Sequence, residues 1–359
     1  LLFAQRDTID FNNNWVFVAD KNGEGNTGKW FERPLAGAKP VSLPHTWNIE
    51  TATERHYGWG WYQKKFKVES AWKSRNLQLR FGAINHSSVI YLNGVKIAEN
   101  TGDGYSKFYV DLNSKVKYGR ENVITIAVNN DYGKNKVPYG SSFDWPNDGG
   151  IIRKAVLLIS GKSSADYITA RTHLNVKDSS GSLRIKLGMD SSRFRRTAIA
   201  VDIREENQPE KNLLFSGRVS PVWVNGEAIA ALQLPRVHPW HFDFPNLYRI
   251  TVTVLDGAKV SDRLSLVVGF REIKFENGKL YLNGERVKLM GVEWTAGSNP
   301  DFGLAETDSL ILSQCRLMKQ VNCIFTRQHF QQDELFYDFC DREGILVQQE
   351  LPLWGPETP

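Results

Sequence analysis

Hydrophobic residues recur in short, mostly alternating runs over the first 160 residues of the chain. Six of these runs are expected to form strands: 66–68, 77–81, 88–92, 108–112, 123–128 and 155–159. Turn residues separate them, and Asn93-Gly94 between two runs is typical of a two-residue hairpin, because both central positions need a positive φ. Short strands at this spacing, without helical stretches between them, predict a β-sandwich.

A similar but independent pattern occupies residues 165–270. Its clearest strand-like runs lie at 167–176, 182–189, 197–205, 227–234 and 248–256. About seven runs over roughly a hundred residues are typical of an immunoglobulin-like sandwich. The polar segment 160–166 is expected to link the two sandwiches.

After about residue 300 the spacing of hydrophobic residues becomes helical. Between residues 305 and 321, the side chains of Leu310, Cys315, Leu317, Met318 and Val321 are expected near one face of a helix. That face would pack against neighbouring strands, so this segment predicts the first helix of a mixed α/β region.

Strands and helices alternate around that helix. A strand is predicted at 286–292, and after the helix come a strand at 322–327, a second helix at 333–344 ending in glycine, and a strand at 345–353. Parallel strands joined by helices predict an α/β domain. A barrel of eight such units takes roughly 250 residues, whereas 80 residues run from Leu280 to Pro359. The pattern therefore fits either a small three-stranded layer or the start of a large domain.

Composition narrows the class of protein. Hydrophobic residues make up 41% of the chain and charged residues 24%, as in soluble globular proteins. No apolar run approaches the ~18 residues that a membrane span needs. The basic residues are scattered, so the net charge of +5 indicates solvated strand faces rather than nucleic-acid binding.

The cysteines and the first residues bear on the compartment of the protein. Cys315, Cys323 and Cys340 are odd in number and lie in apolar contexts, so we expect buried free thiols rather than disulfides or a metal site. Residues 1–5, LLFAQ, give way abruptly to polar sequence, which favours the remnant of a secretory signal peptide over an ordinary first strand. A secreted or periplasmic protein is therefore expected.

Several motifs, taken in order, resemble glycoside hydrolase family 2, the β-galactosidase, β-glucuronidase and β-mannosidase group. They are LPHTWN (43–48), GWGWYQKKFKV (58–68), VIYLNGVKI (89–97), DWPNDGGIIRKAVL (144–157), FPNLYRITVTV (244–254), GFREIKFENGKLYLNGERVKLMGV (269–292) and TRQHFQQDELFYDFCDREGILVQQE (326–350). Each is moderately specific, and their joint order is strongly specific. The resemblance implies a jelly-roll-like sugar-binding β-sandwich over 1–163, an immunoglobulin-like β-sandwich over 164–271 and the start of a (β/α)8 TIM barrel over 272–359.

The same resemblance implies a retaining exo-β-glycosidase, most simply β-galactosidase-like, that acts on terminal β-linked sugars. The family's two catalytic glutamates follow the fourth barrel strand and lie near the seventh, so no catalytic residue is expected before Pro359, and this chain alone is expected to be inactive. The family can use a cation, but no ligand set can be read here, so no cofactor is predicted. The sequence does not decide the association of chains, and a homo-oligomer is one option.

The alternative is a non-catalytic carbohydrate-binding or scaffold protein built from the two sandwiches. A chain adapted to this length should carry polar residues on the uncovered edge of its last parallel strand. Residues 345–354, ILVQQELPLW, are instead largely apolar. This observation favours the glycosidase.

The candidate site residues are those expected at the C-terminal ends of the barrel strands, where barrel enzymes collect functional groups. They are Glu293, Trp294, Arg327, His329, Glu350 and Trp354. Arg327 is expected to hold a sugar hydroxyl or a catalytic carboxylate, or else to close the barrel rim in a salt bridge. His329 would face the same side, and Glu350 is a candidate for fixing Arg327. Trp294 either stacks on a sugar or lies in a lid or core.

Two departures from the family leave its sugar specificity open. Val292-Glu293-Trp294-Thr295 stands where the family usually has an Asn-Arg-His-Glu type sequence, so the sugar-contacting histidine is absent at that point. Arg327-Gln328-His329 is one residue shorter than the family's Arg-x-x-His.

Two aspartates of the first sandwich are further candidates. Asp144 matches an Asp that, in the family, reaches from the sandwich into the barrel site and binds sugar hydroxyls. Alternatively it caps the loop 141–150, which is rich in turn-forming residues. Asp148 is expected to be a turn residue.

Aromatic residues of the first sandwich are better explained by packing. Trp59 and Trp61 share one face of a strand, and together with Tyr62 they are expected in the core rather than on a sugar-binding platform. His45 and Trp47 are expected to pack at a domain junction.

Overall fold

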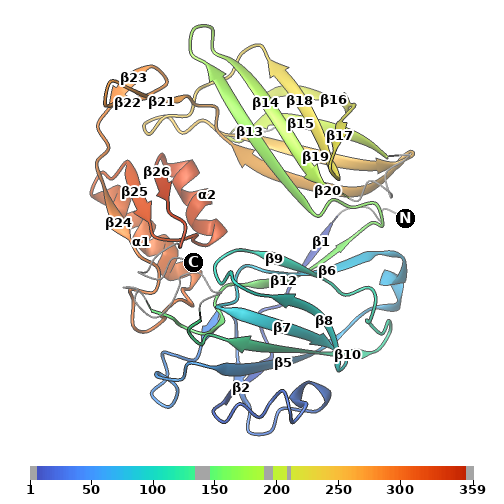
Figure 1. Ribbon diagram of the computed structural model, residues 1–359. Coiled ribbons are helices and arrows are strands. Elements are labelled where there is room, and N and C mark those ends of the chain that lie inside the picture. The colour runs from blue at the N-terminus through green and yellow to red at the C-terminus, as the bar shows by residue number, and fades with distance from the viewer. Residues whose placement is uncertain (1–5, 134–145, 190–196, 208–211, 353–359) are drawn as a thin grey trace.

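Three domains follow one another in the computed structural model, which describes residues 6–133, 146–189, 197–207 and 212–352 (Figure 1). The first two are β-sandwiches. The third begins with a short antiparallel sheet and continues as alternating strands and helices. The predicted fold class is therefore confirmed.

The first domain is a sandwich of two antiparallel sheets. One has the order β1 (Asp7–Asp10), β12 (Ala155–Ser160), β6 (Asn76–Phe81) and β9 (Phe108–Asp111). The other has the order β3 (Lys39–Val41), β2 (Trp15–Asp20), β5 (Trp59–Lys67), β10 (Glu121–Asn129), β7 (Ser87–Leu92) and β8 (Val95–Asn100). A small ladder joins β4 (His45–Thr46) to β11 (Gly150–Ile151), and 3₁₀ turns span Trp30–Glu32 and Ser70–Ser74. The predicted hairpin is confirmed, since Asn93 and Gly94 have φ values of 53° and 81° between β7 and β8.

Aromatic side chains fill much of the interior of the first domain. Trp61 and Tyr62 are fully buried, and Trp59 packs beside Trp61, so the predicted packing role is confirmed. The domain-junction assignment of His45 and Trp47 was wrong. Trp47 is fully buried in the core of this sandwich, and His45 Nδ1 lies 2.7 Å from the Tyr62 hydroxyl, because β4 folds back against the strands of the same domain.

The second domain is a sandwich of two four-stranded antiparallel sheets. One has the order β13 (Tyr167–Asn175), β14 (Ser180–Gly188), β18 (Glu227–Leu234) and β17 (Val222–Val224). The other has the order β16 (Leu213–Val219), β15 (Thr197–Glu205), β19 (Tyr248–Asp256) and β20 (Lys259–Val268). Alternate residues of the inner strands, such as Ile185 and Val252, meet in one buried cluster. This arrangement has the strand pattern expected of an immunoglobulin-like domain.

The third domain contains two separate sheets. The antiparallel one joins β21 (Ile273–Glu276), β22 (Lys279–Leu282) and β23 (Glu285–Val287). The parallel one has the order β24 (Gly291–Trp294), β25 (Phe325–Gln328) and β26 (Leu346–Gln349), with α1 (Asp308–Gln320) and α2 (Glu334–Glu343) as connections. The single strand predicted at 286–292 is therefore wrong, because its first residues pair with β22 and its last residues pair with β25.

Helix α1 confirms the predicted helix but not the predicted buried face. Cys315 and Met318 are buried together with Ile311, whereas Leu317 and Val321 are 52% and 67% exposed. The segment carries two apolar stripes at helical spacing. Only the stripe containing Ile311 turns toward the strands and α2. The predicted buried free thiols are confirmed for all three cysteines.

The first sandwich packs directly on the third domain. A shared apolar cluster consists of Ala83, Tyr105, Ile152, Ala296, Leu304 and Phe330. The rings of Tyr105 and Phe330 stack with centroids 4.2 Å apart. The second domain also contacts α2, where Trp240 Nε1 donates to the carbonyl oxygen of Asp341 at 2.7 Å. The segments that follow β24 and β25 are thus covered by the first sandwich.

Candidate functional site at the ends of the parallel strands

Four of the sequence-predicted residues meet at the C-terminal ends of the three parallel strands. Arg327 Nε and Nη2 donate to the two carboxylate oxygens of Glu350, at 2.5 and 3.0 Å. Its Nη1 donates to Glu293 Oε2, and the other oxygen of Glu293 lies 2.7 Å from His329 Nε2. The expectation that Glu350 fixes Arg327 is confirmed by these contacts.

Strand alternation explains why these side chains share one side of the sheet. Glu293 and Arg327 are direct partners in the parallel register of β24 and β25, so their side chains leave the same face. Trp294, the next residue along β24, leaves the opposite face, where its ring centroid lies 5.3 Å from that of Phe336 in α2. The charged group therefore faces away from the helices and stays partly open to solvent.

The electrostatics of the group follow from this pairing. The hydrogen bond to Glu350 is the main cause that raises the pKa of Arg327, with a smaller contribution from Glu293. The same bond lowers the pKa of Glu350. One permanent cation thus faces two carboxylates. Such a group offers carboxylate oxygens that can accept hydrogen bonds from hydroxyl groups.

One described candidate, Trp294, does not join the group. The side chain of Trp294 is 8% exposed and belongs to the core between the sheet and the helices. Its prediction as a sugar-stacking residue is therefore corrected to the core alternative. Asp144 and Trp354 lie outside the described residues, and the sugar-binding role of Asp144 stays a prediction.

Asp148 is more than a turn residue. Its carboxyl is 7% exposed, and its Oδ2 accepts a hydrogen bond from the backbone N–H of Leu304 at 2.8 Å. Burial raises the pKa of this carboxyl. Gly303 lies so close that a Cβ there would come within 2.0 Å of Asp148 Oδ2. Asp148 thus ties the first sandwich to the loop that follows β24.

Sequence reasoning missed a buried carboxyl behind the site. Glu306 is 7% exposed and accepts hydrogen bonds from Gln332 Nε2 at 2.9 Å and from the backbone N–H of Gly297 at 3.3 Å. Burial is the main cause that raises the pKa of Glu306 to about 7. It connects the loop after β24 with the loop after β25. In the sequence, the only indication of a functional carboxyl here was its position just before Thr307, the N-cap residue of α1. Such a position is a weak indication.

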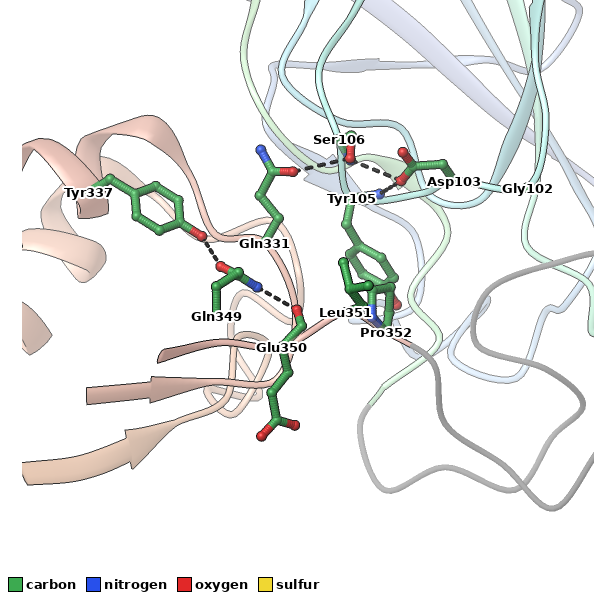
Figure 2. A pocket seen from close by; sticks show the side chains of 10 residues that line it. All are labelled: Gly102, Asp103, Tyr105, Ser106, Gln331, Tyr337, Gln349, Glu350, Leu351 and Pro352. Carbon is green, nitrogen blue, oxygen red and sulfur yellow. Dashed lines mark hydrogen bonds between the residues drawn. The ribbon is translucent and has the colours of Figure 1, made fainter. Parts of the chain in front are cut away.

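A pocket of about 450 Å³ opens on the helix side of β26, between this strand and the loop 102–106 of the first sandwich. Figure 2 shows Tyr337 and Gln349 on one wall and Tyr105 and Ser106 on the other. Gln349 Nε2 donates to the carbonyl oxygen of Glu350 at 2.6 Å, whereas the Glu350 carboxylate points away from Gln349 (Figure 2). The pocket and the charged group therefore lie on opposite sides of the end of β26.

In the described part of the chain, no three His, Cys, Asp or Glu side chains are grouped so that they could hold a metal ion. Among the same residues, no helix has the length and apolar character needed to cross a membrane.

The domain order, with two β-sandwiches followed by parallel strands that helices connect, defines a multidomain protein that contains the beginning of a TIM barrel. Three models of glycosyl hydrolases family 2 match the chain in succession: the sugar binding domain over residues 9–160, the central family domain over 166–271 and the TIM barrel domain over 273–358. The chain therefore belongs to glycosyl hydrolases family 2.

Relatives of this chain carry two kinds of name. A β-galactosidase from Thermoanaerobacter pseudethanolicus is 26% identical over 97% of this chain and 47% of its own length. A β-glucuronidase from Paenibacillus borealis is 27% identical over 98% of this chain and 60% of its own length. A solved β-glucuronidase structure from an uncultured Clostridium sp. is 26% identical, with a TM-score of 0.84 over 97% of this chain and 59% of that chain. This chain thus spans about half the length of the curated relatives that it matches.

Proposed function

We propose that the protein containing these three domains is a retaining exo-β-glycosidase that removes terminal β-linked sugars. The observation that carries the proposal is the Arg327 cluster with Glu293 and Glu350 at the C-terminal ends of parallel strands, where barrel enzymes place their active sites. The relatives named β-galactosidase and β-glucuronidase support the same reaction class.

The role of Arg327, His329, Glu293 and Glu350 in this proposal is to bind and orient, not to react. A general acid needs a raised pKa, but pairing with Arg327 lowers the pKa of Glu350. A retaining reaction also needs a second carboxylate that is free to attack the anomeric carbon, whereas Glu293 is held by Arg327 and His329. We therefore place both catalytic glutamates further along the barrel and propose that the 359-residue chain alone is inactive.

The charge of the group favours a neutral sugar. A uronic-acid carboxylate placed beside Glu293 and Glu350 would meet two like charges, while the only permanent cation of the group is already paired. Galactose-type sugars bring only hydroxyl groups, which can donate to these carboxylates. On this ground we propose a β-galactosidase-like substrate class. Asp144 is proposed to contribute from the first sandwich.

The test compares this chain with a form that also carries the proposed remainder of the barrel, called the longer form, on 4-nitrophenyl β-D-galactoside and 4-nitrophenyl β-D-glucuronide. We expect no nitrophenol from the 359-residue chain and faster release from the galactoside by the longer form. Turnover by the 359-residue chain would refute the placement of the catalytic glutamates. A longer form that binds sugars but cleaves neither glycoside would instead make the protein a carbohydrate-binding protein.

We also propose a secreted or periplasmic location. It is supported by the apolar residues 1–5 ahead of the polar sequence, as in the end of a signal peptide. Fractionation of the source cells followed by detection with an antibody tests it. Recovery of the protein solely with cytoplasmic markers would overturn the proposed location. It would not affect the proposal that the protein is a glycosidase.

A further inference from the structure

The short segment after β25 is held from outside its own domain. Residues 329–332 leave the strand and connect it to the N-cap of α2 without belonging to either element. Phe330 stacks on Tyr105 of the first sandwich, and the side-chain oxygen of Gln331 accepts a hydrogen bond from Ser106 Oγ at 3.1 Å (Figure 2). This segment lacks strand and helix hydrogen bonds, so its backbone depends on such contacts and on the hydrogen bond that the backbone N–H of Gln332 donates to the Tyr337 hydroxyl at 3.0 Å.

Arg153 is the buried cation at this contact. It belongs to the motif DWPNDGGIIRKAVL of the first sandwich and is 7% exposed. Its Nη1 donates to the carbonyl oxygen of Tyr105, and its Nη2 donates to the carbonyl oxygen of Gln331. One guanidinium thus joins the sandwich loop to the barrel segment, two residues after His329.

The residues around Arg153 restrict the movement of its side chain. A buried cation is costly unless it is paired and hydrogen-bonded. Burial is the main cause that lowers the pKa of Arg153, and the carboxyl groups of Asp333 and Glu306 act in the opposite direction. Gly82 lets the chain approach closely, since a Cβ there would come within 2.8 Å of Arg153 Cβ. The guanidinium therefore has little freedom to move away from Gln331.

We infer that Arg153 is a positioning residue: by holding the carbonyl of Gln331 it fixes the segment after β25 and keeps His329 against Glu293. His329 lies beyond the last residue of β25, so the position of its ring depends on the segment that Arg153 contacts, while Arg327 holds Glu293 from the other side. The first sandwich then contributes to the site indirectly, because its Arg153 binds the backbone carbonyl of Gln331 in the third domain. The consequence for sugar binding rests on the proposed function, whereas the placement of His329 does not.

The test uses Arg153→Met, which keeps the length of the side chain and removes the donors. Arg75→Met is the matched control, because Arg75 also donates to two backbone carbonyls, those of Ile159 and Ser160, but lies within the first domain. We measure amide hydrogen exchange of residues 329–333 and the ring ¹⁵N signals of His329, assigned with His329→Gln. Arg153→Met should exchange about tenfold faster in this segment and shift the His329 signals, and Arg75→Met should do neither.

Unchanged exchange and ring signals in Arg153→Met would overturn the inference, as would equal changes in Arg75→Met. If Arg153→Met does not fold, Arg153→Lys, which keeps the charge but loses the two-pronged donor, is judged by the same two readouts. In the longer form, Arg153→Met should then lower kcat/KM for the nitrophenyl glycoside more than Arg75→Met does. A longer form without any turnover would remove the proposed function and leave the exchange result to decide this inference.

Discussion

Arg327 and Glu350 form a two-pronged ion pair across the ends of two neighbouring parallel strands, with N–O distances of 2.5 and 3.0 Å. This geometry fixes the plane of the guanidinium and leaves Nη1 for Glu293. Three nitrogens of Arg327 already donate to protein carboxylates. Arg327 therefore orients those carboxylates and is not a free cation that could pair with an anionic sugar. The orientation of Glu293 and Glu350 is then what a bound sugar would meet.

Arg327→Lys tests this role in the longer form of the protein. A lysine keeps the charge but cannot contact both oxygens of Glu350 and also Glu293. We expect kcat/KM for the preferred nitrophenyl glycoside to fall by about 10- to 100-fold. Arg316→Lys on the exposed side of α1 is the control and should have little effect. Equal activity of the two variants would exclude Arg327 from the site.

The raised pKa of Glu306 predicts that the free energy of unfolding of the third domain depends on pH. Burial raises the pKa of Glu306 from its usual value of 4.5 to about 7. In the unfolded chain this carboxyl loses its proton near its usual pKa, but the folded chain retains the proton until pH 7. The free energy of unfolding of the third domain should therefore fall as the pH rises between these values, by up to about 3 kcal/mol.

Glu306→Gln provides the comparison, because glutamine keeps the shape and cannot ionise. Urea unfolding between pH 5 and pH 8 should show a smaller slope of stability against pH in this variant than in the wild type. Glu285→Gln, at an exposed position in β23, should keep the wild-type slope. An identical slope in Glu306→Gln would show that folding does not raise the pKa of this carboxyl.

Gly303 is predicted to be intolerant of any side chain. Its φ is +51°, and a Cβ there would lie 2.0 Å from Asp148 Oδ2, so alanine would disturb the hydrogen bond that the backbone N–H of Leu304 donates to Asp148. Gly278→Ala is a matched control, since Gly278 has a φ of +71° but no atom within 4 Å of the added Cβ. We expect a loss of about 1 kcal/mol for Gly278→Ala and clearly more for Gly303→Ala, measured by urea unfolding. Similar losses would mean that the contact with Asp148 adjusts freely.

Local patterns in the sequence predicted many of the strands and part of the site. The period of two along 197–205 matches β15, and the order of the βα units was enough to place Arg327 near Glu350. Contacts between domains were not predictable in this way. Arg153 reaches carbonyls that are 48 and 178 positions away along the chain, and these meet only after the first sandwich docks on the third domain.

A local pattern can also contain two solutions, as α1 shows. Leu310, Leu317 and Val321 form one helical stripe, while Ile311 and Cys315 belong to another, and hydrophobicity alone does not say which stripe faces the strands. Trp294 presents the same difficulty on β24. A tryptophan at a strand end suits both a sugar-stacking surface and a core, and only its position relative to Phe336 decides between them.

The thiols of α1 and α2 provide a probe for opening of the third domain. Cys315 and Cys340 are at most 2% exposed and pack in one cluster. Burial raises the pKa of Cys315 to about 12 and also raises that of Cys340. Because the thiolate is the reactive form, a disulfide reagent at pH 8 should label both at least about a thousandfold more slowly than an exposed thiol. Lys279→Cys on the exposed side of β22 provides that exposed thiol, and urea should make all three native cysteines reactive. Rapid labelling of Cys315 or Cys340 without urea would mean that α1 and α2 separate readily in the native chain.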